Sequence, residues 1–237
     1  IFEVWQRAYG MTDWTSTPRL AGCDEKWVEN LTGLLSNHNW SETLQPIVGK
    51  LRLGERLTIA DGHVLYSHKS LHEVGQLASL VKLARFGHNV FFNSNVHINQ
   101  TNICVLACKF CAFRRSKKQS DSYELSIDEY LDEIEKYADV IDEVHSVGGL
   151  HPDWDVDFYE NLISSAKAKF PKISIKALTA VEIKHLSNQS NISFTETLSR
   201  LKNAGLDSLP GGGAEILNDE VREIICNGKE SSEEYLQ

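Results

Sequence analysis

The chain has 237 residues, 41% of them hydrophobic and 24% charged, which is the usual composition of a globular protein. Its net charge of −9 argues against a nucleic-acid partner, because phosphate binding requires a basic surface. No apolar run reaches the ~20 residues of a membrane-spanning helix, so we expect no membrane partner. The chain begins at Ile1 without a methionine and stops soon after a capping-like Ser-Ser-Glu-Glu, so we interpret it as a fragment.

Residues 1–88 predict an N-terminal extension with a helical segment. Within them, residues 40–53 predict a short helix that Pro46 interrupts. The pair Asp61-Gly62 predicts a turn. Apolar residues at near-helical spacing predict a helix over 71–86, and the glycine that follows predicts its end.

From residue 89 onward, short apolar segments alternate with amphipathic ones. The apolar segments predict strands at 90–92, 97–101, 143–147, 173–178 and 206–209. The amphipathic segments predict helices at 127–138, 157–170 and 194–203, of which the first and last follow Ser-x-x-Glu capping boxes. This alternation is typical of βαβ units around a parallel sheet. We therefore predict that residues 89–237 form the N-terminal part of an α/β, TIM-like (β/α) barrel, incomplete at the C-terminus because a closed barrel needs ~250 residues.

Three cysteines, Cys104, Cys108 and Cys111, lie close together directly after the strand predicted at 97–101. Three thiolates on one loop can hold three irons of a 4Fe–4S cluster, which normally takes four protein thiolates. No fourth cysteine lies nearby in the sequence, so one iron is left open to a small molecule, as a catalytic metal site requires. The segment therefore predicts an active site.

Two other interpretations of these cysteines stay open. Together with His97 they could form a structural Cys3His zinc site, and the chain would then be a zinc-binding module without catalytic activity. Disulfide pairing is disfavoured because the number of clustered cysteines is odd and the sequence shows no signal peptide. Free thiolates and an oxygen-sensitive cluster favour a cytoplasmic location.

Three further loops follow predicted strands, whose carboxyl ends carry the chemistry in barrels of this kind. They contain Gly148-Gly149, residues 179–182 and residues 211–215. Paired glycines let a ligand approach the backbone, and three glycines before a helix can form an anion-binding nest. The glutamates of the last two loops could receive an amine or hydroxyl, or could instead stabilise a helix N-terminus. His151 could act as an acid or base, or could be a packed polar side chain.

The pattern Cys104-x3-Cys108-x2-Cys111, with Phe110 just before the last cysteine, resembles the signature of the radical S-adenosylmethionine (SAM) family. The resemblance implies a radical SAM-type barrel in which the three cysteines bind a 4Fe–4S cluster. It also implies that the methionyl group of SAM chelates the open iron and that Phe110 lies near the adenine.

The same resemblance suggests cofactor-binding residues outside the cysteine loop. These are Gly148, Gly149, Thr179 and Glu215. Leu150 departs from the family pattern, because the residue after the two glycines is usually acidic. The resemblance therefore leaves the contact to the SAM amine unassigned.

Four longer motifs narrow the resemblance. They lie at 97–104, 147–153, 176–183 and 209–216 and resemble those of the aminodeoxyfutalosine synthases, a radical SAM family of the futalosine route to menaquinone. The dehypoxanthine futalosine cyclases and FO synthases share the cysteine loop and are the alternative. They usually have Asn where this chain has His151.

The resemblance implies a transferase that adds the 5′-deoxyadenosyl radical to 3-[(1-carboxyvinyl)oxy]benzoate and forms aminodeoxyfutalosine. His151 and Glu182 are the expected catalytic residues, and Arg114 is a candidate for binding a substrate carboxylate. The implied partners are this small-molecule substrate and a one-electron donor such as flavodoxin or ferredoxin.

Overall fold

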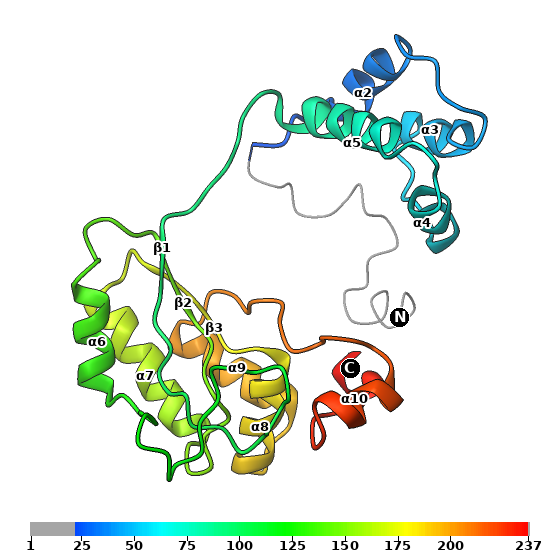
Figure 1. Cartoon of the computed structure of the whole chain (residues 1–237). Coiled ribbons are helices and arrows are strands. Elements are labelled where there is room, and N and C mark those ends of the chain that lie inside the picture. Colours follow the sequence, from blue (N-terminus) through cyan, green and yellow to red (C-terminus); the bar gives the residue numbers. More distant parts are fainter. Residues whose placement is uncertain (1–21, 237) are drawn as a thin grey trace. The chain divides into compact units, whose positions relative to one another are not determined.

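The computed structural model describes residues 22–236. The chain divides into two compact units, Ile1–Phe91 and Phe92–Gln237 (Figure 1). A separate hydrophobic core lies in each unit. No helix in the described part of the chain is long and apolar enough to cross a membrane.

The described residues of the first unit form a small helical core. The helices are α2 (Trp27–Leu35), α3 (Gln45–Arg52), α4 (Ile59–Tyr66) and α5 (Leu71–Phe86). Their apolar sides pack together, with Leu31 and Leu44 fully buried. α5 confirms the helix expected over 71–86, and it ends at Gly87 as predicted.

Two predictions in this unit are wrong. Pro46 does not interrupt a helix but lies in the first turn of α3, where its missing N–H removes no intrahelical bond. Asp61-Gly62 is not a turn but belongs to α4. The Asp61 carboxylate accepts the N–H of Thr58 at 2.7 Å, and the Thr58 hydroxyl accepts the N–H of Asp61 at 3.3 Å. This capping box starts the helix that the sequence pattern did not reveal.

A parallel sheet organises the second unit (Figure 1). Its strands, in spatial order, are β1 (Asn95–His97), β2 (Glu143–Ser146) and β3 (Ser174–Ala177). The register places His97 opposite His145, and His145 opposite Lys176. The segment 206–209, predicted to be a strand, contributes only an isolated bridge to Lys176, and 90–92 is not a strand.

β1 lies earlier in the chain than predicted because the chain leaves the sheet soon after His97. Thr101 forms an isolated antiparallel bridge with Glu124 instead of extending β1. Its hydroxyl also donates to the carbonyl of Tyr123 at 2.7 Å. These bonds direct the chain into the cysteine segment.

Helices connect and follow the strands. They are α6 (Ile127–Glu135), α7 (Val156–Lys169), α8 (Ala180–Ser190), α9 (Phe194–Ala204), α10 (Asp219–Ile225) and α11 (Ser232–Leu236). The predicted capping box of Ser126 and Glu129 is present at the start of α6. Ser193 caps α9 by accepting the N–H of Glu196 at 3.2 Å.

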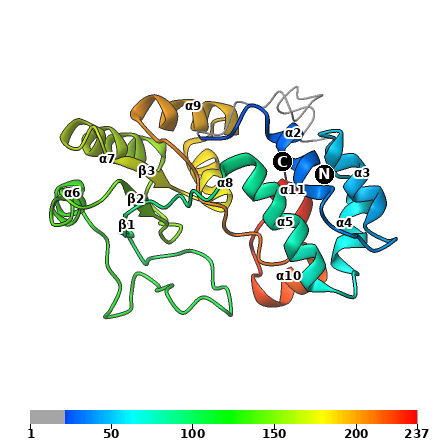
Figure 2. The ribbon, with the colours of Figure 1, turned by 90° about the horizontal axis from the view of Figure 1, so that it is seen from above.

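The sheet has one apolar face and one polar face. Val144, Ile175 and Ala177 are buried in a core shared with Leu162 of α7 and Leu186 of α8. Figure 2 shows α7 and α9 on the same side of the three strands. Because side chains alternate along a strand, the intervening residues point to the opposite face. The α/β class and the parallel sheet expected from the sequence are confirmed.

Candidate active site

The cysteine loop (residues 102–115) lies between β1 and α6 and is held by backbone hydrogen bonds to other segments. The N–H of Val105 donates to the carbonyl of Leu150 at 3.0 Å, directly after the two glycines that follow β2. The N–H of Lys109 donates to the carbonyl of Ile225 at 2.8 Å, at the end of α10. The loop is therefore attached to segments far from it in the sequence.

The three thiols of this loop differ in exposure. Cys104 and Cys108 are half-buried, whereas Cys111 is exposed. Burial raises the pKa of the Cys108 thiol, and the Lys229 ammonium counteracts this rise. Cys226, Cys104 and Cys111 lie near enough to raise the pKa of Cys108 further. A fourth cysteine, to which the sequence assigned no role, thus lies near the loop.

The loop suits an iron–sulfur cluster by the chemistry of its donors. Among residues 22–236 no three His, Cys, Asp or Glu side chains are already arranged around a metal position. The fit rests on three soft thiols in one loop, the ligands that such clusters take. The N–H of Cys111 donates to the carbonyl of Cys108 at 3.1 Å, which keeps these two cysteines in one turn. His97, the fourth ligand of the alternative zinc site, stacks on His145 with ring centroids 4.9 Å apart.

The glycine pair after β2 is required by close packing against the cysteine loop. A Cβ on Gly149 would lie 2.6 Å from the carbonyl carbon of Ile103 and 3.0 Å from the Cβ of Cys104. A Cβ on Gly148 would lie 2.5 Å from the amide nitrogen of Gln100. A side chain on Gly149 would push the cysteine loop away, and one on Gly148 would displace the Gln100 side chain. The absence of a side chain at Gly149 therefore allows this segment to lie close to the first cysteine of the loop.

Glu182 is buried behind this glycine pair and holds it in place. One carboxylate oxygen accepts the N–H of Gly148 at 3.0 Å. The other accepts both the N–H of Thr179 at 2.7 Å and its hydroxyl at 2.9 Å. Burial raises the pKa of Glu182 to about 7, although these hydrogen bonds act in the opposite direction. The carboxyl group therefore links the glycine pair to the start of α8.

Thr179 and Glu182 form a capping box at the start of α8. The sequence contains the same Thr-x-x-Glu signature that marks other helix starts, but its position after a predicted strand favoured an active-site loop. Of the two roles expected for Glu182, the structure shows the stabilisation of a helix N-terminus. The side chain is 3% exposed and its oxygens contact backbone and hydroxyl donors.

His151 is likewise buried, and both its ring nitrogens have partners. Nε2 lies 2.7 Å from a carboxylate oxygen of Glu124, and Nδ1 accepts the N–H of Asp153 at 3.2 Å. Because Nδ1 is the acceptor, Nε2 is the nitrogen that donates to Glu124. The ring also stacks on Trp154, with centroids 4.3 Å apart. These contacts fix the orientation of the loop that follows the glycine pair.

Lys229 joins the third predicted loop to the cysteine loop. Its ammonium lies 2.9 Å from both carboxylate oxygens of Glu215 and donates to the carbonyl of Gly213 at 3.2 Å. It also lies 5.9 Å from the ring centroid of Phe110, within the range of a cation–π contact. The Lys229 side chain is only 8% exposed, which strengthens these interactions. Phe110 and Glu215 are thus brought together by a residue that the sequence did not single out.

Arg222 fixes the same segment from its other side. The guanidinium donates to the carbonyl of Ala214 at 2.6 Å, to that of Ile216 at 3.1 Å and to that of Glu230 at 2.7 Å. Gly213 and Glu215 have positive φ angles of 93° and 48°, so this backbone requires such support. No local motif predicts the contacts of Arg222 or Lys229, because their side-chain partners lie outside the adjacent helical turn.

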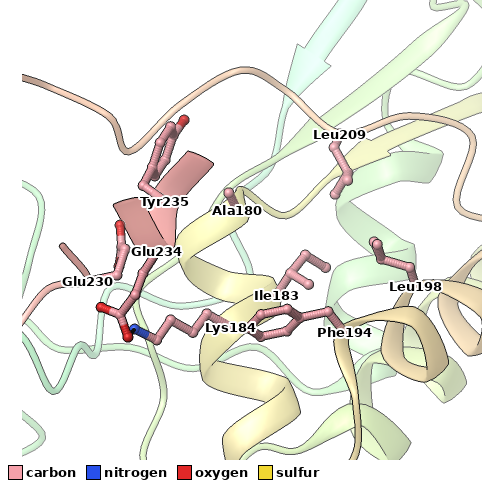
Figure 3. A pocket seen from close by; sticks show the side chains of 9 residues that line it. All are labelled: Ala180, Ile183, Lys184, Phe194, Leu198, Leu209, Glu230, Glu234 and Tyr235. Carbon is pink, nitrogen blue, oxygen red and sulfur yellow. Dashed lines mark ion pairs between the residues drawn. The ribbon is translucent and has the colours of Figure 1, made fainter. Parts of the chain in front are cut away.

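An apolar pocket of about 160 Å³ lies next to this segment (Figure 3). It is lined by Ala180, Ile183, Lys184, Phe194, Leu198, Leu209, Glu230, Glu234 and Tyr235. The Lys184 ammonium lies 2.9 Å from Glu234, and the Tyr235 hydroxyl donates to the carbonyl of Gly212 at 2.9 Å. The first contact attaches α11 to α8, and the second attaches it to the loop at 211–215.

Contacts connect most of the predicted site residues into one network at the strand ends. The chain of contacts runs through Cys104, Gly149, Gly148, Glu182, Thr179, Gly212, Gly213, Lys229, Glu215 and Phe110. His151 contributes from a buried position behind the glycine pair. Gln100, Arg222 and Lys229 are additional residues that support this network.

The fold and the site define an α/β protein with an iron–sulfur-type cysteine loop at the carboxyl ends of parallel strands. Residues 98–237 match the radical SAM superfamily. The chain belongs to this superfamily, whose members use a 4Fe–4S cluster and SAM. The three cysteines that this chemistry requires are Cys104, Cys108 and Cys111.

Two characterised relatives are similar over most of the chain. An aminodeoxyfutalosine synthase from Thermus thermophilus is 39% identical over 195 residues, which are 82% of this chain and 52% of the relative. A cyclic dehypoxanthine futalosine synthase from Streptomyces coelicolor is 35% identical over 202 residues, which are 82% of this chain and 50% of the relative. The chain spans about half the length of these relatives.

A solved structure shows the same fold. Methylornithine synthase superimposes on 79% of this chain and 52% of its own, with a TM-score of 0.58 and 20% sequence identity. At this identity the likeness concerns the fold alone, and it agrees with an α/β radical SAM domain.

Proposed function

We propose that this chain is part of a radical SAM enzyme that forms aminodeoxyfutalosine. The observation that carries the proposal is the network of contacts from Cys104 to Glu215, made by the motifs in which the chain resembles aminodeoxyfutalosine synthases. The alternative, a dehypoxanthine futalosine cyclase or an FO synthase-like enzyme, is supported by the similarity to the Streptomyces coelicolor relative. His151 in the loop after β2 favours the first reaction.

In this proposal the cluster and SAM, when bound, supply one electron and the 5′-deoxyadenosyl radical, which is added to 3-[(1-carboxyvinyl)oxy]benzoate. Cys104, Cys108 and Cys111 hold the cluster. Gly148 and Gly149 present bare backbone to the methionyl group, and Phe110 provides an aromatic surface for the adenine. The protein orients the reactants and excludes competing hydrogen donors.

The buried polar residues take positioning roles in the proposed reaction. Glu182 and Thr179 fix the glycine pair, and Lys229 fixes Glu215, which we propose contacts SAM. His151 orients the loop after β2 through Glu124. We therefore infer that His151 and Glu182 affect catalysis through the geometry of their neighbours.

The remaining parts of the proposal concern the wider protein. We propose that the parallel sheet is part of a TIM-like (β/α) barrel, and that a flavodoxin or ferredoxin supplies the electron. Free thiols at Cys104, Cys108 and Cys111 and an oxygen-sensitive cluster fit a reducing compartment, so we place the protein in the cytoplasm.

The test is anaerobic reconstitution with iron and sulfide, followed by incubation with SAM, a reductant and 3-[(1-carboxyvinyl)oxy]benzoate. We expect a mass-resolved nucleoside adduct identical to aminodeoxyfutalosine. Cys108→Ala is the matched control, because it removes one cluster ligand and should abolish the adduct. Release of 5′-deoxyadenosine in place of the adduct would support the cyclase. Stoichiometric zinc without iron or sulfide in anaerobically purified protein would rule out both enzymes.

A further inference from the structure

Three basic side chains form a row across the polar face of the sheet. His97, His145 and Lys176 are paired in register on β1, β2 and β3, so their side chains point to the same side. The imidazoles of His97 and His145 stack with centroids 4.9 Å apart and an interplanar angle of 29°. The row lies on the face opposite to Val144 and Ile175, which are buried in the hydrophobic core.

The nitrogens of this row have unused hydrogen-bonding capacity. Within residues 22–236, neither the imidazoles of His97 and His145 nor the Lys176 ammonium make a hydrogen bond. The ammonium lies 3.6 Å from a carboxylate oxygen of Glu143, beyond ordinary hydrogen-bond length. That oxygen is itself buried without a hydrogen-bond partner in the described residues. His97 is exposed and His145 and Lys176 are half-buried, so the donors of the row are accessible to a ligand.

The rest of this face is polar as well. The positions that share it on the three strands are Asn95, His97, Glu143, His145, Ser174 and Lys176. Inward-facing positions of barrels are usually filled by Val, Ile and Leu, which pack against one another. None of these six residues is apolar, so the face suits a polar ligand.

The electrostatics of the row favour an anion. Burial, His97 and Lys176 lower the pKa of His145, and only Glu143 raises it. Without a ligand, the row therefore resists taking up a further positive charge. A carboxylate placed against it would satisfy the free donors and stabilise the protonated imidazole.

We propose that His97, His145 and Lys176 form the subsite that binds a carboxylate of the substrate. The inference rests on the proposed function and adds a location for the anionic end of the benzoate. His145 precedes Gly148 by three residues, which at the rise of a strand is about 10 Å. That distance accommodates an aromatic ring between the carboxylate and the glycines that contact SAM. Arg114, the candidate from the sequence, instead directs its Nε to the carbonyl of Cys104 at 3.4 Å.

The test compares His145→Gln and Lys176→Met in the reconstituted protein, with Lys172→Met as the matched control. Lys172 is exposed just before β3 and does not belong to the row. We expect the KM for 3-[(1-carboxyvinyl)oxy]benzoate to rise about ten- to a hundredfold in each row variant, the usual loss for a charge-assisted hydrogen bond. The Kd for SAM and the melting temperature should stay at their wild-type values. The Lys172→Met protein should match the wild type throughout.

A second measurement separates this inference from the proposed function. In calorimetric titrations the wild type should bind benzoate but not benzamide, which is its uncharged analogue. Both row variants should lose the binding of benzoate. If the wild type binds benzoate in this manner but forms no adduct, the proposed function fails and the subsite stands. If the adduct forms and the KM and benzoate affinity of folded row variants stay within twofold of wild type, the subsite is refuted.

Discussion

Replacing Gly149 by alanine should separate the glycine pair from the cysteine loop. The added Cβ would lie 2.6 Å from the carbonyl carbon of Ile103, whereas ordinary contact begins at 3.4 Å. The two nearest atoms belong to the backbone of Ile103, and Gly149 itself is tied to the carbonyl of Thr101 by a 2.9 Å hydrogen bond. The cysteine loop must therefore move by about 1 Å, a displacement that can lower a rate about a hundredfold. Overpacking of this kind also costs about 1–3 kcal/mol in the free energy of unfolding.

The assay measures iron and sulfide bound per chain after anaerobic reconstitution, the rate of SAM cleavage, and the urea midpoint of the protein before reconstitution. We expect the Gly149→Ala protein to lose cleavage activity and to unfold at lower urea. Gly75→Ala in α5 is the control, because a Cβ there meets no atom within 4 Å and alanine favours a helix. It should keep the wild-type cluster content.

A Gly149→Ala protein with wild-type stability, cluster content and SAM cleavage would refute this reasoning. It would show that the backbone of Ile103 moves easily to accommodate the added Cβ. The packing of the glycine pair against the cysteine loop would then have no part in positioning the cofactors.

Glu182→Gln should flatten the pH dependence of stability before reconstitution. The folded-state pKa of about 7 lies above the ordinary value of 4.5, so the folded chain binds more protons between these values and wild-type stability falls as pH rises from about 4.5 to 7. The difference between wild type and variant should change by up to about 3 kcal/mol between pH 4.5 and 8 in urea titrations, and parallel profiles would contradict this. Lys229→Met should weaken SAM binding about tenfold, because Glu215 loses its partner. Lys118→Met, an exposed change, is the control, and equal SAM affinities in the two variants would contradict the role of Lys229.

Local signals in the sequence predicted the local structure well. The capping box of Ser126 and Glu129 starts α6, and Gly87 ends α5, because both features depend on residues within one helical turn. The positions of the glycine pair and the cysteines also followed from the sequence. The reason for the cysteines lies within their own loop, whereas the packing of Gly149 against Ile103 is visible only in the fold.

Where the sequence did not predict the structure, the cause was either a competing local signal or a contact between distant residues. Asp61 was assigned to a turn because Asp-Gly is a common turn pair, although Thr58 provides a capping partner three residues earlier. For Glu182 the sequence left two roles open, of which the structure shows the helix-capping role, and its role in catalysis stays a prediction. Lys229 could not be found at all, since it contacts Phe110 across more than a hundred residues of sequence. Such contacts are determined by the fold and produce no periodic pattern in the amino-acid sequence.

The two faces of the sheet have different roles, which fall to alternate residues of each strand. Val144, Ile175 and Ala177 provide the apolar burial that stabilises the unit, whereas His145 and Lys176 contribute little to it. Exchanging a side chain on the polar face should therefore change stability by only about 0.5 kcal/mol. The specificity of such a scaffold can be rebuilt one residue at a time without unfolding it, which makes this sheet a suitable starting point for enzyme engineering.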